Sequence, residues 1–423
     1  MTDKQAGPAS GKLEHPTYAG LFQCIGAECE DACCGEWDIP LDKITYQRYR
    51  QFPQEKLGSL VSHFVSENPA STHDGTYAYI HRTSSGSCPF FGEDRLCSVQ
   101  KEYGPALLSA TCSLYPRSLS QVDGLLEGTL ILSCPEAARL VLLSPSLEEL
   151  ESNLHSGEFR TDNVFSLAGD VGNHRRPPEH FLAVRSLLIE LIRDRSRPMW
   201  QNLLMVVSFC KRLDEVTNDL KTELVPALLD RYRMALGQGP SDELESLPRD
   251  LKRRIELVIT LTSEQCSNLS SGKRFQDAFW DFVGGIGSAD SAAPDEDMGR
   301  FRIAERDYYR PFMDAHPFII ENYLVNHMLL HLFPYGRAGG RLIVRSASDE
   351  CLLLTVQFFW VSSLLIGIAG RYRESFATEH VVSTVQSFTR AVGHIPQVQE
   401  DMLAAVRRRG LDDLSGLSIL LRT

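Results

Sequence analysis

The stretch Cys351-Leu-Leu-Leu-Thr-Val-Gln-Phe-Phe-Trp-Val-Ser-Ser-Leu-Leu-Ile-Gly-Ile-Ala-Gly370 has twenty residues and no charged side chain. A helix of this length could cross a bilayer. The stretch nevertheless carries Thr355, Gln357, Ser362 and Ser363, and the flanking segments show no basic bias. We therefore expect a helix buried in the core of a large α-helical body, and no membrane span.

Apolar residues recur at helical spacing throughout the chain after about residue 140. Four such faces lie in the segments 182–192, 203–213, 251–261 and 381–392. Residues 141–423 are therefore predicted to form a helical body that contains the substrate pocket. Two polar or glycine-rich stretches, 156–178 and 284–299, are predicted to be connections.

The N-terminal part has a different pattern. Residues 1–17 are polar and without the apolar run of a secretory signal, so they predict a loosely ordered start of a cytoplasmic protein. Residues 18–140 are rich in cysteine, with a helix expected from Asp42 and strands expected at 77–81 and 125–133. The predicted fold is mainly α, with a small, irregular α+β section at its N-terminal end.

Composition narrows the possible partners. The 423 residues include 43 Lys and Arg against 55 Asp and Glu, which gives a net charge of −12. An acidic chain is poorly suited to neutralising phosphates, so no nucleic-acid partner is expected. Hydrophobic residues are 43% and charged residues 23% of the chain, proportions typical of a folded protein.

The cysteines are clustered. Eight of the eleven lie between Cys24 and Cys134, where a uniform distribution would place about three. In a reducing compartment such clusters more often bind metals than form disulfides. The candidate metal ligands are Cys24, Cys29, Cys33, Cys34, Cys88, Cys97, Cys112 and Cys134.

The spacing of these cysteines leaves the metal open. Eight thiolates could hold one four-iron cluster with four to spare, two four-cysteine sites, or zinc. The gaps after Cys24 and Cys29 are four and three residues, which differs from the paired knuckles of zinc modules. Adjacent residues such as Cys33 and Cys34 are awkward as two ligands of one ion. Iron–sulfur is favoured over zinc.

The cysteines lie in distinctive motifs, namely Phe22-Gln23-Cys24, Cys88-Pro89-Phe90, Cys112-Ser113-Leu114-Tyr115-Pro116-Arg117 and Ser133-Cys134-Pro135, and a further motif is the distant segment His316–His327 continuing to Phe333-Pro334. Together these motifs resemble the flagellin lysine-N-methylase family. It implies transfer of methyl groups from S-adenosylmethionine to lysine side chains of flagellin. It also implies a [4Fe–4S] cluster held by N-terminal cysteines.

The segment His316–Pro334 is predicted to be an extended entry followed by a helix starting at Pro317. Its polar residues suggest a pocket wall, because buried polar groups need partners. Glu321 and Tyr323 are the candidate proton acceptors for the attacking lysine, and Asn322 and Asn326 are candidate cofactor-binding residues. The alternative is a structural helix whose polar face meets water or a neighbouring element.

No glycine-rich loop lies between a strand and a helix in the way that a Rossmann nucleotide site requires. A cluster iron with an open position could instead coordinate the amino and carboxylate groups of S-adenosylmethionine. Two other functions fit the cysteines: a non-catalytic iron- or zinc-binding protein, and a redox or radical enzyme acting on another substrate.

Overall fold

The computed structural model describes residues 13–16, 20–35, 37–71, 74–122, 125–145, 147, 150–151, 165–167, 177–267, 272–287, 294–338 and 345–422. The chain divides into two compact units. Unit 1 comprises residues 1–140 and 147–165, and unit 2 comprises 141–146 and 166–423. The fold is mainly α with a small sheet region near the N-terminus, as the sequence predicts.

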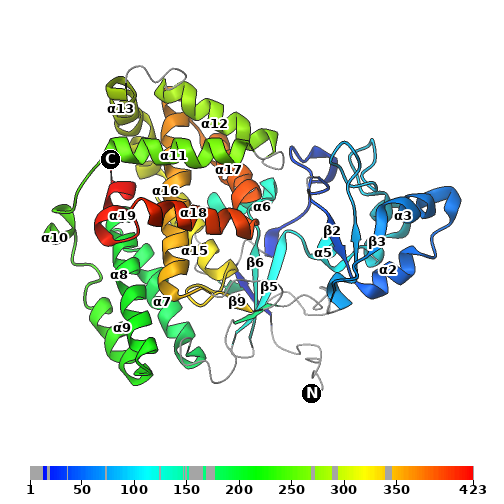
Figure 1. The fold of residues 1–423 in the computed structure, drawn as a ribbon, viewed down its shortest axis with the longest axis horizontal. Coiled ribbons are helices and arrows are strands. Elements are labelled where there is room, and N and C mark those ends of the chain that lie inside the picture. The colour runs from blue at the N-terminus through cyan, green and yellow to red at the C-terminus, as the bar shows by residue number, and fades with distance from the viewer. Residues whose placement is uncertain are drawn as a thin grey trace. The chain divides into compact units, whose positions relative to one another are not determined.

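Unit 1 contains short elements around two small sheets (Figure 1). In chain order they are β1 (Leu13–Pro16), β2 (Ile39–Leu41), α2 (Lys43–Tyr49), α3 (Ser59–Phe64), β3 (Val65–Glu67), β4 (Ala78–Ile80), α4 (Ser98–Tyr103), α5 (Ala110–Leu114), β5 (Arg117–Val122), β6 (Leu125–Leu130), α6 (Pro135–Leu142), which runs past the boundary, and β7 (Leu150–Glu151). Strands β2, β4 and β3 form an antiparallel sheet, and β1 pairs in parallel with β6, the partner of β5 in a hairpin.

Local sequence explains several of these elements. The Asp42 carboxylate caps α2 by accepting a hydrogen bond from the Thr45 amide at 2.9 Å. The predicted strands at 77–81 and 125–133 are observed as β4 and β6. The start of the chain differs from expectation at residues 13–16, which form β1 because β6 and β7 supply backbone partners on either side. The other residues of the predicted 1–17 start lie outside the described ones.

Unit 2 is a helical body. Its longer elements are α7 (Phe181–Ile192), α8 (Met199–Asn218), α9 (Val225–Arg233), α11 (Leu251–Cys266), α12 (Lys273–Ile286), α13 (Pro294–Ala304), α15 (Phe318–Leu330), α16 (Ala347–Tyr372), α17 (Thr378–Phe388), α18 (Pro396–Arg408) and α19 (Leu414–Leu421). Shorter ones are β8 (Phe165–Leu167), whose first residue belongs to unit 1, α10 (Asp242–Glu245), α14 (Arg310–Ala315) and β9 (Arg337–Ala338). Strands β8 and β9 are antiparallel. The four predicted helical faces lie on α7, α8, α11 and α17.

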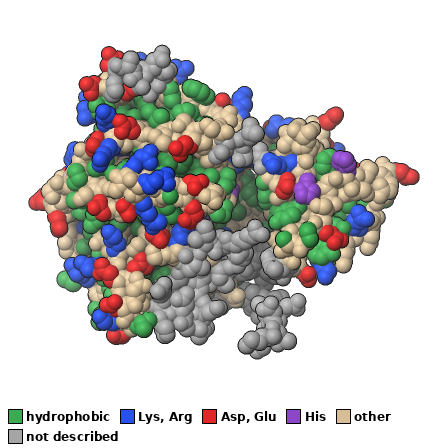
Figure 2. Space-filling view, viewed as in Figure 1, with side chains coloured by type: hydrophobic (Ala, Val, Ile, Leu, Met, Phe, Trp, Pro, Cys, Tyr) green, Lys and Arg blue, Asp and Glu red, His purple; other side chains and the backbone are tan. Residues whose placement is uncertain are grey.

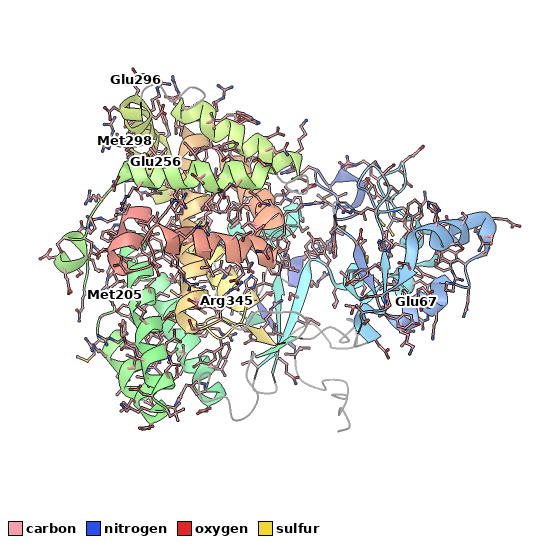
Figure 3. All side chains as sticks on the ribbon, viewed as in Figure 1. Glu67, Met205, Glu256, Glu296, Met298 and Arg345 are labelled. Atoms are coloured by element: carbon pink, nitrogen blue, oxygen red, sulfur yellow. The ribbon has the colours of Figure 1, made fainter. Side chains whose placement is uncertain are left out.

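Helix α16 is the centre of unit 2. It runs between α8, α12, α13 and α17 (Figure 1). By length and composition it could cross a membrane, yet its apolar window is completely buried within the structure. The Trp360 indole N–H donates to the Thr262 hydroxyl of α11 at 2.7 Å. Arg345, which lies just before α16 and is labelled in Figure 3, donates to Glu400 Oε1 of α18 at 2.6 Å. The uncharged stretch is therefore a core helix, as expected.

The predicted connection 284–299 overlaps two helices, because α12 continues to Ile286 and α13 begins at Pro294. Gly285 lies within α12, where the helix packs closely against α16. A Cβ at this position would lie 1.8 Å from the Gly367 carbonyl oxygen, so the contact requires glycine. Residues 288–293, like 156–164 and 168–176 of the other predicted connection, lie outside the described residues. On the face of unit 2 shown in Figure 2, acidic and basic side chains intermingle.

Candidate functional site

The eight candidate thiols all belong to unit 1, and all but Cys112, which lies within α5, are at the end of a short element or in a loop. Cys24 and Cys29 flank a 3₁₀ turn at Gly26–Glu28. Cys97 precedes α4, and Cys134 precedes α6. None of the eleven cysteines, all of which are described, forms a disulfide.

Four thiols share one apolar core. Cys88 is buried in it, and Cys34, Cys97 and Cys112 pack against it. The Cys88 amide donates to the Cys34 carbonyl at 2.7 Å, which fixes these two segments side by side. Residues that are far apart in the chain are thus brought together by the tertiary structure.

The other thiols lie around the loop that contains Cys29. Glu30 in this loop accepts two hydrogen bonds from Arg139 of α6, at 2.6 and 3.1 Å. This pair holds the loop against the helix that begins just after Cys134, and the Cys134 thiol interacts electrostatically with Cys29 and Cys33. Cys33 interacts in the same way with Cys34, Cys88, Cys97 and Cys112 and so lies between both groups.

The electrostatics of this cluster disfavour thiolates in the absence of a cation. Burial, followed by mutual repulsion, raises the pKa of Cys112 and that of Cys134 to about 12. A hydrogen bond with Cys33 and burial raise the pKa of Cys34 far above its usual range. A bound cation would reverse this effect, because metal ligation stabilises the deprotonated thiol.

The donor set therefore suits a metal centre with sulfur ligands. Within the described ranges, however, no three His, Cys, Asp or Glu side chains are grouped closely enough to hold a metal ion. The thiols are neighbours rather than a preassembled coordination sphere, and their role as ligands stays a prediction.

Unit 2 contains a cavity of about 870 Å³, a size typical of small-molecule sites. Its walls come from the segment between α7 and α8, from α8, α11, α14, α15 and α16, from the helical turn Glu305–Tyr309, and from the C-terminal end of α19. Apolar side chains such as Trp200, Ile320 and Phe358 alternate with charged ones. The cavity could therefore bind a ligand with both apolar and ionic groups.

The predicted helix 317–330 is observed as α15, with Pro317 at its N-cap. Of the four residues predicted to act there, Glu321 lines the cavity. Its carboxylate accepts two hydrogen bonds from Arg195, at 2.6 and 2.8 Å. The Glu321 side chain is 9% exposed and that of Arg195 is 60% exposed. The buried carboxylate in the cavity wall is therefore paired with a cation that lies largely in solvent.

The other three predicted site residues on α15 are buried and do not line this cavity; they are Asn322, Tyr323 and Asn326. Asn322 donates both amide hydrogens to backbone carbonyls, those of Val141 at 3.0 Å and Ser144 at 2.7 Å, and so fastens that segment to α15. Burial raises the pKa of Tyr323 well above its usual range, so its phenol stays protonated at neutral pH. The predicted roles of Tyr323, Asn322 and Asn326 have no direct support in this geometry.

The sequence interpretation missed Arg195 and Arg254, which both line the cavity. Arg195 lies in a connection and has no local signal. Arg254 does have one, because it falls on the same helical face as Leu251 and Val258, where an arginine is out of place. A charged residue on an apolar stripe is a sign of a buried polar site.

Residues 185–420, which enclose most of the cavity lining, match the family model described as the FliB lysine N-methylase C-terminal domain. The chain belongs to this family, which confirms the resemblance seen in its motifs. No solved structure matches the fold.

Three curated relatives are similar to parts of the chain. Two are lysine-N-methylases, from Salmonella typhimurium strain LT2 and Salmonella choleraesuis, each 32% identical over 155 residues. Each match covers 36% of this chain and spans only 38% of the relative's length. The third is the flagellar biosynthetic protein FliU of Salmonella muenchen, 33% identical over 134 residues, which are 31% of this chain and 78% of that protein.

Proposed function

We propose that this chain methylates lysine side chains of flagellin in the cytoplasm, with S-adenosylmethionine as methyl donor. The observation that carries the proposal is the position of the cavity: the family match over residues 185–420 contains Glu321 and the helices around it. The names of the relatives, two lysine-N-methylases and a flagellar biosynthetic protein, agree with this reaction and substrate.

Methyl transfer to lysine is a displacement at the methyl carbon of a sulfonium. The amine must be neutral to attack, although its ordinary pKa is about 10.4. We assign Glu321 as the group that receives the incoming ammonium and accepts its proton at a carboxylate oxygen, because it lines the cavity. Arg195 is largely exposed and can move away as the lysine enters. Tyr323 is the weaker candidate, since its raised pKa keeps the phenol protonated.

We also propose that thiols of unit 1 hold a [4Fe–4S] cluster. The convergence of Cys34, Cys88, Cys97 and Cys112 on one core makes these four the leading ligands. Cys24, Cys29, Cys33 and Cys134 form the neighbouring candidate set. When bound, such a cluster supplies a redox-active, Lewis-acidic iron centre. The residues of the chain contribute the sulfur donors and a partly buried surrounding.

A non-catalytic iron- or zinc-binding protein is the second candidate, because the same thiols would serve it equally well. The two functions are separated by an in vitro transfer assay. Purified protein, kept free of oxygen, is incubated with purified flagellin and methyl-labelled S-adenosylmethionine. Label in flagellin lysines supports the methylase. Metal-loaded protein that transfers no label supports the binding protein.

A matched pair of variants locates the site. Glu321→Gln should abolish transfer, whereas Glu256→Gln, on the exposed face of α11 (Figure 3), should leave it unchanged. Equal transfer by the two variants would remove Glu321 from the mechanism.

A further inference from the structure

The cavity of unit 2 is rich in arginine, and most of these cations are already paired. The six are Arg195, Arg197, Arg249, Arg254, Arg310 and Arg422. Arg195 pairs with Glu321, and Arg310 pairs with Glu305 at 2.5 Å. Arg249 and Arg422 share Glu245, and Arg197 lies 3.7 Å from Asp194. Across the described ranges, Arg254 is the member of this set with no carboxylate within 4.0 Å.

Arg254 is nevertheless deeply buried, with only 2% of its surface exposed. Its Nε donates to the Ser363 hydroxyl at 3.2 Å and one terminal nitrogen donates to the Ser362 hydroxyl at 3.5 Å. The rings of Phe301 and Phe359 lie 5.6 and 5.9 Å from the guanidinium carbon. These neutral partners do not balance a positive charge removed from water.

The guanidinium remains charged despite this environment. Burial lowers the pKa of Arg254 to about 10, and Glu305 opposes that shift. Glu305 is itself engaged by Arg310, so it does not serve as a direct counter-ion. A buried cation that faces a cavity and lacks an ion-pair partner is most simply explained by an anionic ligand group.

The same cavity offers the opposite charge at Asp314. This carboxylate is exposed and, within the part of the chain that the structure describes, has no cation within 4.0 Å, although it acts electrostatically on Arg310. A ligand with a carboxylate for Arg254 and a positive charge elsewhere would suit both parts of the cavity wall. Aromatic and aliphatic side chains such as Trp200, Met313 and Ile366 provide surface for an apolar remainder.

We propose that this cavity binds S-adenosylmethionine with its carboxylate held by Arg254, and that Asp314 supplies negative charge for the positive groups of the ligand. The choice of S-adenosylmethionine rests on the proposed function; the carboxylate-binding chemistry rests on Arg254. This assignment competes with coordination of the same carboxylate by a cluster iron in unit 1.

The test compares two ligands that differ in one group. Binding of S-adenosylmethionine and of decarboxylated S-adenosylmethionine is measured by calorimetry on the metal-loaded full chain, for the wild type, Arg254→Met and Arg253→Met. Arg253 is the control, because it is exposed on the same helix and does not line the cavity. Methionine keeps the length of the arginine stem and adds no buried charge.

The wild type should bind the carboxylate-bearing ligand roughly 10- to 100-fold more tightly, the range for one charge-assisted hydrogen-bonded pair. Arg254→Met should bring the two affinities together, and Arg253→Met should keep the wild-type preference. A wild type that binds both ligands equally contradicts the proposal without the use of any variant. So does an Arg254→Met protein that retains the preference, and so does binding of free L-methionine without binding of S-adenosylmethionine.

These outcomes are separable from the proposed function. Binding that depends on Arg254, without methylation of flagellin, would support the binding site and contradict the proposed reaction. Methylation of flagellin, with an unchanged ligand preference in Arg254→Met, would support the reaction and contradict the binding site.

Discussion

Arg195 and Glu321 form two parallel hydrogen bonds, of 2.6 and 2.8 Å, between the connection after α7 and the buried helix α15. The arginine is largely in solvent and the carboxylate is largely out of it. This arrangement puts a charged acceptor in the cavity wall with a partner that can leave at small cost, since ion pairs with an exposed member contribute little.

The first prediction concerns Glu321→Gln. The amide retains the shape of the side chain but cannot accept a proton from lysine, so the methylation rate should fall about 100-fold or more. Stability should change by only about 1 kcal/mol, because the arginine partner is exposed. The rate of methyl incorporation and a thermal melt measure the two effects. A large loss of stability together with normal methylation would show that the pair is structural.

The second prediction concerns the thiols. Replacing Cys88 and Cys97 by serine should remove most bound iron, because both contact the apolar core of unit 1 at which the leading candidate ligands meet. Cys266→Ser, in α11 of unit 2, should leave the iron content unchanged. Iron and sulfide analysis of oxygen-free protein measures this. Full iron content in the double variant would exclude both cysteines as ligands.

The third prediction concerns pH. His327 is 8% exposed, and burial lowers its pKa to about 3, whereas the unfolded chain titrates near 6.5. Because the unfolded state binds the proton first, stability should be lost as pH falls from about 6.5 towards 3. At pH 5 the loss from this residue should be about 2 kcal/mol.

His327→Gln provides the comparison, since glutamine does not titrate. Urea unfolding at pH 7.5 and pH 5 should show a smaller drop in the free energy of unfolding for the variant than for the wild type. An equal drop in both proteins would mean that His327 does not contribute to the acid sensitivity.

The fourth prediction concerns the contact between α12 and α16. Gly285→Ala places a methyl group 1.8 Å from the Gly367 carbonyl oxygen, so the helices must separate, and unfolding should become easier by about 3 kcal/mol or more. Gly299→Ala in α13 meets nothing within 4 Å and should stabilise the protein by about 0.5–1 kcal/mol. Chemical denaturation measures both. A neutral Gly285→Ala would show that the helices pack less closely.

Much of the fold was predictable because its signals are local. The uncharged stretch at 351–370 predicts a buried helix, and the apolar faces after residue 140 predict helices with one buried side. These helices are observed. The capping aspartate Asp42 likewise predicts its own helix. The strand at 13–16 was missed because its partners are distant in sequence.

The candidate sites were less predictable for the same reason. The clustering of cysteines was evident, yet the contact of Cys34, Cys88, Cys97 and Cys112 with one core depends on tertiary pairing. The cavity is lined from several separate segments, so sequence indicated Glu321 but not its partner Arg195. Polar residues of α15 suggested a pocket wall, whereas Asn322 serves to hold a neighbouring segment.

The central claim is that this chain adds methyl groups to flagellin lysines, and its most direct measurement is peptide mass spectrometry of flagellin. Flagellin is produced in cells together with the wild type, Glu321→Gln or Glu256→Gln, and in cells without the chain. The account predicts lysine peptides heavier by whole methyl groups with the wild type and Glu256→Gln, and unmodified lysines in the other two samples. Unmodified flagellin in the presence of abundant, metal-loaded wild-type protein would contradict it.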